Sequence, residues 1–404
     1  MASWNSPFHL LVLLFLFLLT KSFNSNAENF NMGCIDKERE ALLQFKQGLR
    51  DPSGRLSSWD VGVDCCNWFG VGCDNQTGHV SRLDLRSQDY CSDLEESEAE
   101  YYNVSCLSGT LNPSLLDLTY LNYLDLSNNN FRGIPFPEFI VLLRNLRYLD
   151  ISFTSFTGMI PSGIKNLSNL QYLGLIMYSD SGLWVSDLNW LLSLSSLQYL
   201  DLRGLDLRNA SNNWLQVLSM LPSLRELHLS SCRLNTFPPF VKYDNFTSLS
   251  VLDLSFNNFL GIPIPEFIGS LKNLRYLDLS AASFIGMVPP NLGNLSNLQY
   301  LELSSLSISI LDLNWLSGLS SLRHLNLGGL NLSKVTTSWL QVVNMLPKLR
   351  ELHLFSCELR NFDHFLPFVN LTSLFFSCPF LQQLQLSNTS MAIQYKYPHD
   401  HSAF

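Results

Sequence analysis

Leucines alternate with other residues in a pattern that recurs along most of the chain. The motif L-x-x-L-x-L appears eleven times, from LNYLDL at 121–126 to LQQLQL at 381–386. Its second leucine recurs at intervals of 24 to 32 residues, and HVSRLDL at 79–85 is a first, partly degenerate copy. Leucines at alternate positions predict a short strand with one buried face, and a period near 24 residues is typical of stacked coils.

One coil cannot enclose its own leucines, so the coils must stack to form a shared core. The fold class we predict is an α/β leucine-rich-repeat solenoid, with a curved parallel β-sheet on its concave face. A leucine-rich helical bundle is disfavoured, because alternate leucines do not line up along a helix.

A longer period is superimposed on the repeat. Residues 124–172 recur at 252–300, residues 187–202 at 312–327, and residues 213–232 at 338–357. A block of five coils is therefore duplicated. A lengthened surface suits binding better than one fixed catalytic pocket.

The N-terminus predicts export from the cell. Residues 10–19 (LLVLLFLFLL) are apolar, and Ser25-Asn26-Ala27 follows as a small-x-small cleavage site. Ten apolar residues are too few to span a bilayer, so we assign residues 1–27 to a signal peptide, with a buried core helix as the disfavoured alternative. No other stretch of this chain reaches 18 apolar residues, so we expect no membrane span in it.

The charge pattern argues against a nucleic-acid partner and for a glycan coat. The formal net charge is −9, and charged residues make up 15% of the chain, against about 25% in a typical protein. Export makes Asn-x-Ser/Thr a glycan acceptor. Glycosylation is predicted at nine sites: Asn75, Asn103, Asn166, Asn209, Asn245, Asn294, Asn331, Asn370 and Asn388.

Residues 28–85 read as an N-terminal cap and not as a repeat. We expect Asp36 to cap a helix that runs to Arg50, with Leu42, Phe45 and Leu49 on its buried face. Trp59 and Trp68 are expected to cover the leucines of the first coil. Residues 86–117 form an insertion before the repeats of 118–390, since Leu83 and Leu124 are 41 residues apart.

Residues 34–85 (C-IDKEREALLQFKQGL…DCCNW…TGHVSRLDL) closely resemble the cap of plant leucine-rich-repeat receptor-like proteins and kinases. The resemblance continues through G-x-I/V-P at 158–161 and 286–289. The DLNWL and WLQV blocks are most similar to receptor-like proteins of the fungal-xylanase elicitor receptor and Cf resistance type. The resemblance implies disulfides Cys34–Cys65 and Cys66–Cys73. A zinc site at these four cysteines is disfavoured, because Cys65 and Cys66 are adjacent and the compartment is oxidising.

The remaining cysteines are predicted from their positions. Cys91 and Cys106 bracket the insertion, and we expect them to form a disulfide. Cys232 and Cys357 occupy the ninth position of the repeat five coils apart, about 24 Å at one strand spacing per coil, and should be buried thiols. Cys378 has no predicted role. The ninth position is Asn in only some coils, so we expect the later coils to be less regular.

The outward strand positions are the candidate binding surface. One column carries tyrosines and the next carries Asp or Glu, a combination that suits a polypeptide ligand with basic residues, although the same residues are repeat consensus and stabilise neighbouring strands. The candidate ligand contacts are Tyr148, Phe153, Tyr172, Met177, Arg203, His228, Phe256, Tyr276, Tyr300, His353 and Phe355. His228 and His353 lie five coils apart and cannot share a metal ion, so no metal site is expected. The acidic run between Asp89 and Glu100 is interpreted as a solvated loop or a docking loop for a basic partner.

No catalytic motif or phosphate-binding loop is present, so we expect neither an enzyme nor a cofactor. The resemblance implies an extracellular receptor of plant defence, at the plasma membrane or in the apoplast, that binds a protein or peptide and acts through leucine-rich-repeat receptor kinases as co-receptors. The alternative is a secreted inhibitor similar to polygalacturonase-inhibiting proteins. Residues 391–404 read as a short non-repeat tail, which favours a truncated product or an incomplete gene model.

Overall fold

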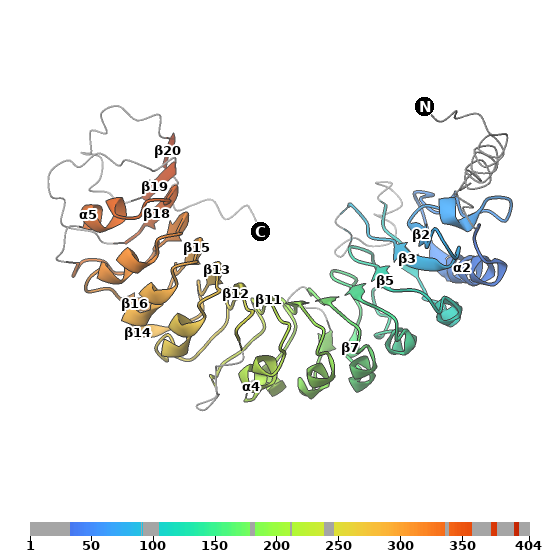
Figure 1. Cartoon of the computed structure of the whole chain (residues 1–404), viewed down its shortest axis with the longest axis horizontal. Coiled ribbons are helices and arrows are strands. Elements are labelled where there is room, and N and C mark those ends of the chain that lie inside the picture. The colour runs from blue at the N-terminus through green and yellow to red at the C-terminus, as the bar shows by residue number, and fades with distance from the viewer. Residues whose placement is uncertain are drawn as a thin grey trace, which may run out of the picture.

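The computed structural model describes residues 33–89, 91, 105–177, 182–210, 212–237, 246–335 and 339–357, together with the strands at 373–377 and 392–395. The predicted signal peptide lies outside these residues. Within them the chain winds into an arc of coils, with the strands on the inner side and the helices on the outer side (Figure 1).

Among the described residues, one sheet of 14 strands lines the concave face, and after the first strand every neighbouring pair is parallel. The predicted solenoid is thus confirmed, and each L-x-x-L-x-L copy from residue 121 to 354 contains a strand. The strands, in spatial order, are β2 (Val71–Cys73), β3 (Val80–Asp84), β5 (Tyr123–Asp125), β6 (Tyr148–Asp150), β8 (Tyr172–Gly174), β10 (Tyr199–Asp201), β11 (Glu226–His228), β12 (Val251–Asp253), β13 (Tyr276–Asp278), β15 (Tyr300–Glu302), β17 (His324–Asn326), β18 (Glu351–Phe355), β19 (Ser373–Ser377) and β20 (Ala392–Tyr395).

Equivalent leucines pair across neighbouring strands and form the core. Leu124, Leu149 and Leu173 are partners in successive strands, and each is fully buried. Burying one leucine contributes about 1.5–3 kcal/mol, so the stacked leucines are the main stabilising component of the fold. Because a one-residue slip would turn this face toward water, the leucines also fix the register.

The convex side consists mainly of single 3₁₀ turns. Several begin directly after a proline, whose fixed φ and missing N–H suit the first turn of a helix. These turns are η3 (Glu138–Leu142), η4 (Ser162–Asn166), η8 (Glu266–Ser270) and η9 (Pro290–Asn294), and two short α-helices, α4 (Trp214–Ser219) and α5 (Trp339–Asn344), lie on the same side (Figure 1). Two small parallel sheets flank the main one, β7 (Gly158–Met159) with β9 (Leu183–Trp184) and β14 (Ile285–Met287) with β16 (Ser307–Ser309).

Buried polar side chains at the ninth repeat position close the turns after the strands. Asn257 donates to the carbonyls of Leu229 and Leu254 at 2.7 and 3.0 Å and accepts from the Leu234 amide at 3.0 Å. The Cys232 and Cys357 thiols are buried, as expected, and donate to carbonyls in the same way. Coils with Leu or Ala at this position still place their strands in register, so the later coils are regular.

The cap helix differs from the prediction at both ends. Helix α2 spans Asp36–Gly48, Ile35 is its N-cap, and no side chain caps it, so the prediction that Asp36 is the N-cap was wrong. Asp36 lies inside the first turn and accepts from Arg39. The helix ends before Arg50, because β1 (Leu49–Arg50) pairs with β4 (Ser108–Gly109). Leu42 and Phe45 are buried, as predicted, but Leu49 lies in β1, beyond the helix, and is only half-buried.

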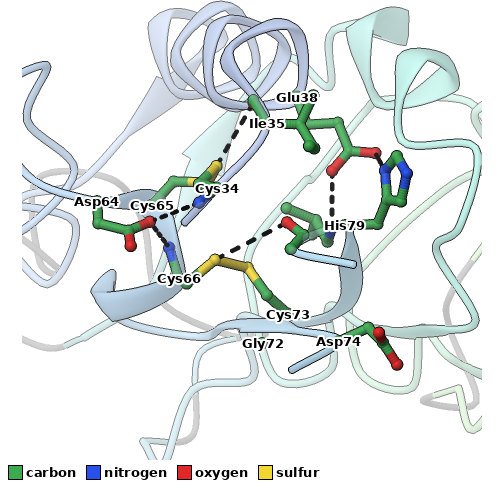
Figure 2. Close-up of a disulfide and its surroundings, with 12 residues drawn as sticks. Cys34, Ile35, Glu38, Asp64, Cys65, Cys66, Gly72, Cys73, Asp74 and His79 are labelled. Atoms are coloured by element: carbon green, nitrogen blue, oxygen red, sulfur yellow. Dashed lines mark hydrogen bonds and ion pairs between the residues drawn. A yellow bond between two sulfur atoms is a disulfide. The ribbon is translucent and has the colours of Figure 1, made fainter. Parts of the chain in front are cut away.

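Disulfides stabilise the cap and the insertion, and a buried carboxylate joins the cap helix to the first coil. Three disulfides link Cys34 to Cys65, Cys66 to Cys73 and Cys91 to Cys106, the pairs expected from the sequence. Figure 2 shows Glu38 reaching from α2 toward His79 at 2.8 Å, and its second oxygen accepts from the Val80 amide at 2.7 Å. Trp59 and Trp68 are stacked and buried in the same core cluster as Leu83.

The far end of the sheet includes part of the expected tail. Strand β20 pairs parallel with β19, so residues 392–395 continue the sheet. The last predicted repeat strand, at 381–386, and Cys378 lie outside the described residues.

Candidate binding surface on the concave face

The first outward column of the sheet is a stack of aromatic rings. Tyr123, Tyr148, Tyr172 and Tyr199 lie on consecutive strands, with neighbouring ring centroids 4.1, 4.1 and 4.3 Å apart. The Arg82 guanidinium lies 3.6 Å from the centroid of the Tyr123 ring. The stack arises because identical positions of parallel strands are neighbours in the sheet.

A second aromatic stack follows in the other half of the sheet. Tyr276, Tyr300 and His324 stack with centroids 4.4 and 4.1 Å apart. Glu226 and Val251 occupy the same column between the two stacks. The duplication therefore presents two aromatic strips in line along the concave face.

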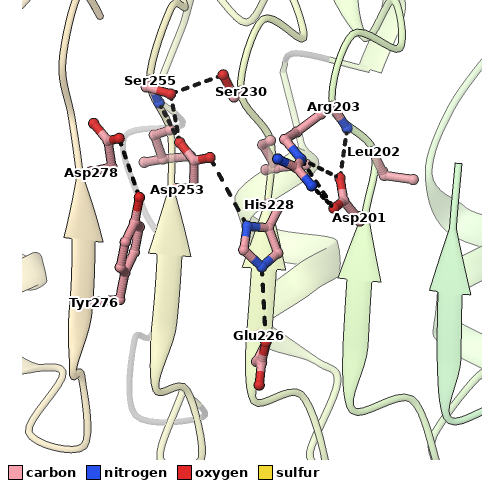
Figure 3. Close-up of polar contacts among 12 residues, drawn as sticks. Asp201, Leu202, Arg203, Glu226, His228, Ser230, Asp253, Ser255, Tyr276 and Asp278 are labelled. Atoms are coloured by element: carbon pink, nitrogen blue, oxygen red, sulfur yellow. Dashed lines mark hydrogen bonds and ion pairs between the residues drawn. The ribbon is translucent and has the colours of Figure 1, made fainter. Parts of the chain in front are cut away.

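The second outward column carries carboxylates that are bonded within the protein. Asp278 accepts from the Tyr276 hydroxyl at 3.4 Å (Figure 3). Its other oxygen accepts from the Ser280 amide at 2.9 Å. Asp125, Asp150, Asp201 and Asp253 accept the amide two residues later in the same way. These carboxylates hold the turn after each strand and position the tyrosines, so their first role is structural.

Burial of this column changes its acidity. Burial raises the pKa of Asp278 to about 6, and the negative charges of Asp253 and Glu302 act in the same direction, against hydrogen bonds from Ser280. Burial also raises the pKa of Asp150 above its usual value, against hydrogen bonds from Ser152. The more accessible acids of the concave face are Glu226 and Glu351, whose side chains are 44% and 50% exposed.

Two candidate contacts stand in a strained backbone conformation just beyond the strands. Phe153 and Phe256 have φ of 57° and 54°, in the left-handed region that bulky residues rarely adopt. Phe256 is 54% exposed. Such strain persists only where the surroundings impose it, and it concentrates at functional sites.

The remaining candidate contacts differ in how deeply they are buried and in what their side chains contact. Met177 is buried at 4% exposure, so its expected place on the binding surface was wrong. Its amide donates to the Arg203 carbonyl at 2.8 Å, and this bond continues the pattern of the Leu175 amide, which donates to the Asp201 carbonyl. Arg203 itself is held by Asp201 through a two-pronged ion pair at 2.7–3.1 Å (Figure 3). Phe355 is partly buried, and its ring lies where a Cβ at Gly328 would stand, so the absence of a side chain at Gly328 makes room for the ring.

The two repeated histidines lie on the concave face in different surroundings. His228 lies between Glu226 and Asp253, at 3.9 and 4.0 Å (Figure 3). His353 packs against His324, with ring centroids 4.9 Å apart.

A row of arginines at the start of the strands was missed by the sequence reading. They occupy the second position of the repeat, next to the tyrosine column, and are exposed: Arg147, Arg225, Arg275, Arg323 and Arg350. The signal was present as L-R-Y-L, L-R-E-L and L-R-H-L. On β6 and β13 the surface thus runs from a guanidinium through a tyrosine to an aspartate, whereas on β11, β17 and β18 the last of these positions is His or Asn.

The sequons and the acidic run are only partly described. Five sequon asparagines lie among the described residues, and all are exposed: Asn75, Asn166, Asn209, Asn294 and Asn331. Asn103, Asn245, Asn370 and Asn388 lie outside the described residues. Of the acidic run, Asp89 is described, and it accepts from the Ser105 amide at 2.7 Å.

Among the described residues, no helix has the length and apolar character needed to cross a membrane.

Comparison with protein families identifies both parts of the chain. The family described as "Leucine rich repeat N-terminal domain" matches residues 35–74. The family described as "Leucine Rich Repeat" matches residues 120–142, 145–167, 223–243, 248–271 and 273–295. The cap and the repeats are thus recognised independently.

Curated relatives come from plants. Receptor-like protein EIX2 of Solanum lycopersicum is 48% identical over 64% of this chain and 25% of its own length. Receptor-like protein EIX1 of the same species is 38% identical over 60% of this chain and 24% of its own length. Receptor-like protein 39 of Arabidopsis thaliana is 32% identical over 70% and 27%. The chain therefore spans about a quarter of the length of these relatives.

Solved structures share the fold. The ectodomain of the Arabidopsis receptor kinase GASSHO1/SCHENGEN3, in complex with CASPARIAN STRIP INTEGRITY FACTOR 2, aligns with a TM-score of 0.59 at 27% identity, over 79% of this chain and 35% of its own. The Arabidopsis receptor kinase HAESA, in complex with the peptide hormone IDA and the co-receptor SERK1, aligns with a TM-score of 0.56 at 25% identity, over 84% and 54%.

Proposed function

The chain belongs to the plant leucine-rich-repeat receptor-like proteins, and from this we propose that its concave face binds an extracellular protein or peptide ligand. The observation that carries the proposal is the pair of aromatic strips, Tyr123 to Tyr199 and Tyr276 to His324, with Arg147, Arg275 and Arg323 among the residues on one side and mostly carboxylates on the other. Tyrosine supplies contact area at a low entropy cost, and the flanking charges orient a polar chain.

The ligand we propose is an extended segment with basic side chains. Most aspartates of the sheet are bonded internally, so the basic groups would meet the exposed carboxylates of Glu226 and Glu351. These two residues occupy the tyrosine column at the ends of the two strips. Phe256 lies in the same central part of the sheet as Glu226 and would provide an apolar contact.

The wider role is proposed from the relatives. We propose that the protein acts in the secretory pathway or at the outer face of the plasma membrane, in defence signalling, and that it reaches the cell interior through receptor kinases as co-receptors. Support comes from the similarity to receptor-like proteins and from the HAESA complex, which contains a peptide and a co-receptor. Binding in this role needs no chemical step.

The test is a selection with a random twelve-residue peptide library displayed on phage, against the full chain secreted from plant cells and immobilised. We expect enriched peptides to carry Lys or Arg and an aromatic residue. Glu226→Gln combined with Phe256→Asn should weaken their binding about tenfold, whereas Met345→Ala, an exposed residue beside α5 on the convex side, should not. Enrichment of peptides that bind all variants equally would overturn the proposed surface.

We also propose that the exposed sequons carry glycans. Asn166 and Asn294 end equivalent 3₁₀ turns in the two copies of the duplicated block, on the convex side away from the aromatic strips. Enzymatic deglycosylation of the secreted protein should lower its mass, and Asn166→Gln should remove one glycan. An unchanged mass spectrum for the variant would show that this sequon is unoccupied.

A further inference from the structure

Four titratable side chains meet on three adjacent strands near the far end of the concave face. Glu302 lies on β15, His324 on β17, and Glu351 and His353 on β18. The register pairs His324 with Glu351 and places Glu302 and His353 on either side of Asn326. Residues far apart in the sequence thus converge because parallel strands repeat the same outward positions.

The atoms lie at short distances. His324 Nδ1 is 2.9 Å from Glu351 Oε2, and His324 Nε2 is 3.4 Å from Glu302 Oε2. One ligand atom from each of His324, Glu351 and His353 falls within 4.8 Å of the others. Donor atoms around a tetrahedral Zn²⁺ lie about 3.3 Å apart, so metal binding would shorten the wider of these separations.

We propose that His324, Glu351 and His353 bind a divalent transition-metal ion, Zn²⁺, on the concave face. Two imidazoles and one carboxylate form a donor set that Zn²⁺ accepts. Glu302 would take the outer position, accepting the N–H of the His324 nitrogen that does not face the metal. Such a carboxylate fixes the tautomer and the orientation of a metal-binding imidazole.

The site is accessible to solvent and to a ligand. The side chains of His324 and Glu302 are 14% and 10% exposed, and that of Glu351 is 50% exposed. Three protein ligands leave one tetrahedral position for water or for a donor group of a bound molecule. A metal ion here would therefore add a directional contact at one end of an aromatic strip.

The first copy of the duplicated block is an internal comparison. His228 and Glu226 are the equivalents of His353 and Glu351, at an offset of 125 residues. In the first copy, Tyr199 occupies the position equivalent to His324, and Gly174 occupies the position equivalent to Glu302. His228 lies 3.9–4.0 Å from its two carboxylate neighbours (Figure 3). The ring beside it on β10 is that of Tyr199 and not a second imidazole. The second copy alone combines two imidazoles with a carboxylate.

The other grouping of candidate ligands in the described part of the chain is Cys34, Asp64, Cys65 and Cys66. Its three cysteines are all in disulfides, so their sulfurs cannot act as thiolate ligands. The proposed site is therefore confined to the concave sheet.

The test is calorimetric titration of ZnCl₂ into the full secreted chain, purified without a histidine tag and freed of metal with EDTA. We expect one Zn²⁺ per chain and a rise in melting temperature on binding. His324→Tyr, which installs the residue of the first copy, and His353→Asn should each weaken binding more than about tenfold, and Glu302→Gln about tenfold. His228→Asn, the matched control, should bind as the unaltered protein does.

Three results would overturn the proposal: no saturable binding by the unaltered chain, unchanged affinity in His324→Tyr and His353→Asn, or an equal loss in His228→Asn. Circular dichroism checks that each variant folds. Glu351→Gln serves as a further variant, because its half-exposed side chain can be changed with little effect on packing. This test uses the metal alone, so its outcome is independent of any peptide ligand.

Discussion

The Tyr172 hydroxyl donates at 3.2 Å to Asp150, a carboxylate on the neighbouring strand. Other tyrosines of the column bond the acid two residues later on their own strand, but that position after Tyr172 is Gly174. A Cβ at Gly174 would lie 2.7 Å from the Asp150 carboxylate oxygen. The missing side chain lets one carboxylate serve two tyrosines, Tyr148 and Tyr172.

Replacing Gly174 with Ala should therefore destabilise the fold. The added methyl group would displace Asp150 from the two tyrosines, and we expect a loss of about 1–3 kcal/mol in the free energy of unfolding. Thermal unfolding followed by circular dichroism measures this. Gly62→Ala is the control, because its added Cβ would make only ordinary contact with Asp60 in the exposed cap loop. Equal melting temperatures for the two variants would contradict the explanation.

Asn257→Ala should lower the free energy of unfolding by about 3 kcal/mol. The substitution leaves the Leu229 and Leu254 carbonyls and the Leu234 amide without their buried partner. Chemical denaturation followed by tryptophan fluorescence gives the change. The neighbouring Asn258 is exposed and accepts from the Leu260 amide, so Asn258→Ala should cost less than about 1 kcal/mol. A small effect at both positions would show that the coil turns do not depend on the asparagine.

Asp278 should make the protein less stable as the pH rises from about 4 to 6. Its folded pKa is raised to about 6 from an ordinary value of 3.8, so in this range the unfolded chain releases a proton that the folded chain retains. Stability is therefore higher below the unfolded pKa and falls until the pH passes the folded pKa. Asp278→Asn should remove this fall and stabilise the protein at pH 7 by about 1–3 kcal/mol.

The structure supplies a precedent and a control for that substitution. Asn326 occupies the equivalent position in a later strand and accepts the Gly328 amide at 2.8 Å, so an amide side chain fits there. Asn314 is exposed and carries no titratable group, so Asn314→Ala should leave the pH profile unchanged. The measurement is the melting temperature of the unaltered chain and of both variants at pH 4, 5, 6 and 7. A parallel profile for Asp278→Asn and the unaltered chain would contradict the role given to Asp278.

Phe256→Asn should raise stability while it weakens ligand binding. Asparagine tolerates the left-handed conformation better than phenylalanine does, and Asn128 adopts it at the equivalent position of the first copy, with φ of 56°. We expect a gain of about 1 kcal/mol in the free energy of unfolding and weaker binding of library-selected peptides. Leu142→Asn, at an exposed convex position in η3, should show neither effect. A loss of stability in Phe256→Asn would mean that the ring packs for structural reasons.

The strands and the core could be predicted because the information is local. Each L-x-x-L-x-L copy predicts which residues point inward. Stacking of the coils then determines which strands are neighbours, as the pairing of Leu124 with Leu149 shows. The cap disulfides followed from a specific resemblance. The surface assignment of Met177 failed because this residue continues the inward-facing series of Leu173 and Leu175 and is buried as they are.

The candidate site was harder to predict because its properties depend on neighbouring strands. The sequence identified the Tyr and Asp columns but did not show that each aspartate is committed to the turn two residues later. It compared His228 with His353 as distant copies and excluded a shared metal. His324, the nearer partner, lies 29 residues before His353 in the chain and becomes its neighbour only through the register of β17 and β18.

The antiparallel strand β2 has a consequence for the behaviour of the protein in solution. It is three residues long, pairs with β3 across a bulge, and is held by the Cys66–Cys73 disulfide. A short, irregular and covalently tethered strand is a poor template for a strand from another molecule. The amino-terminal edge of the sheet therefore disfavours end-to-end association of these arcs into fibrils.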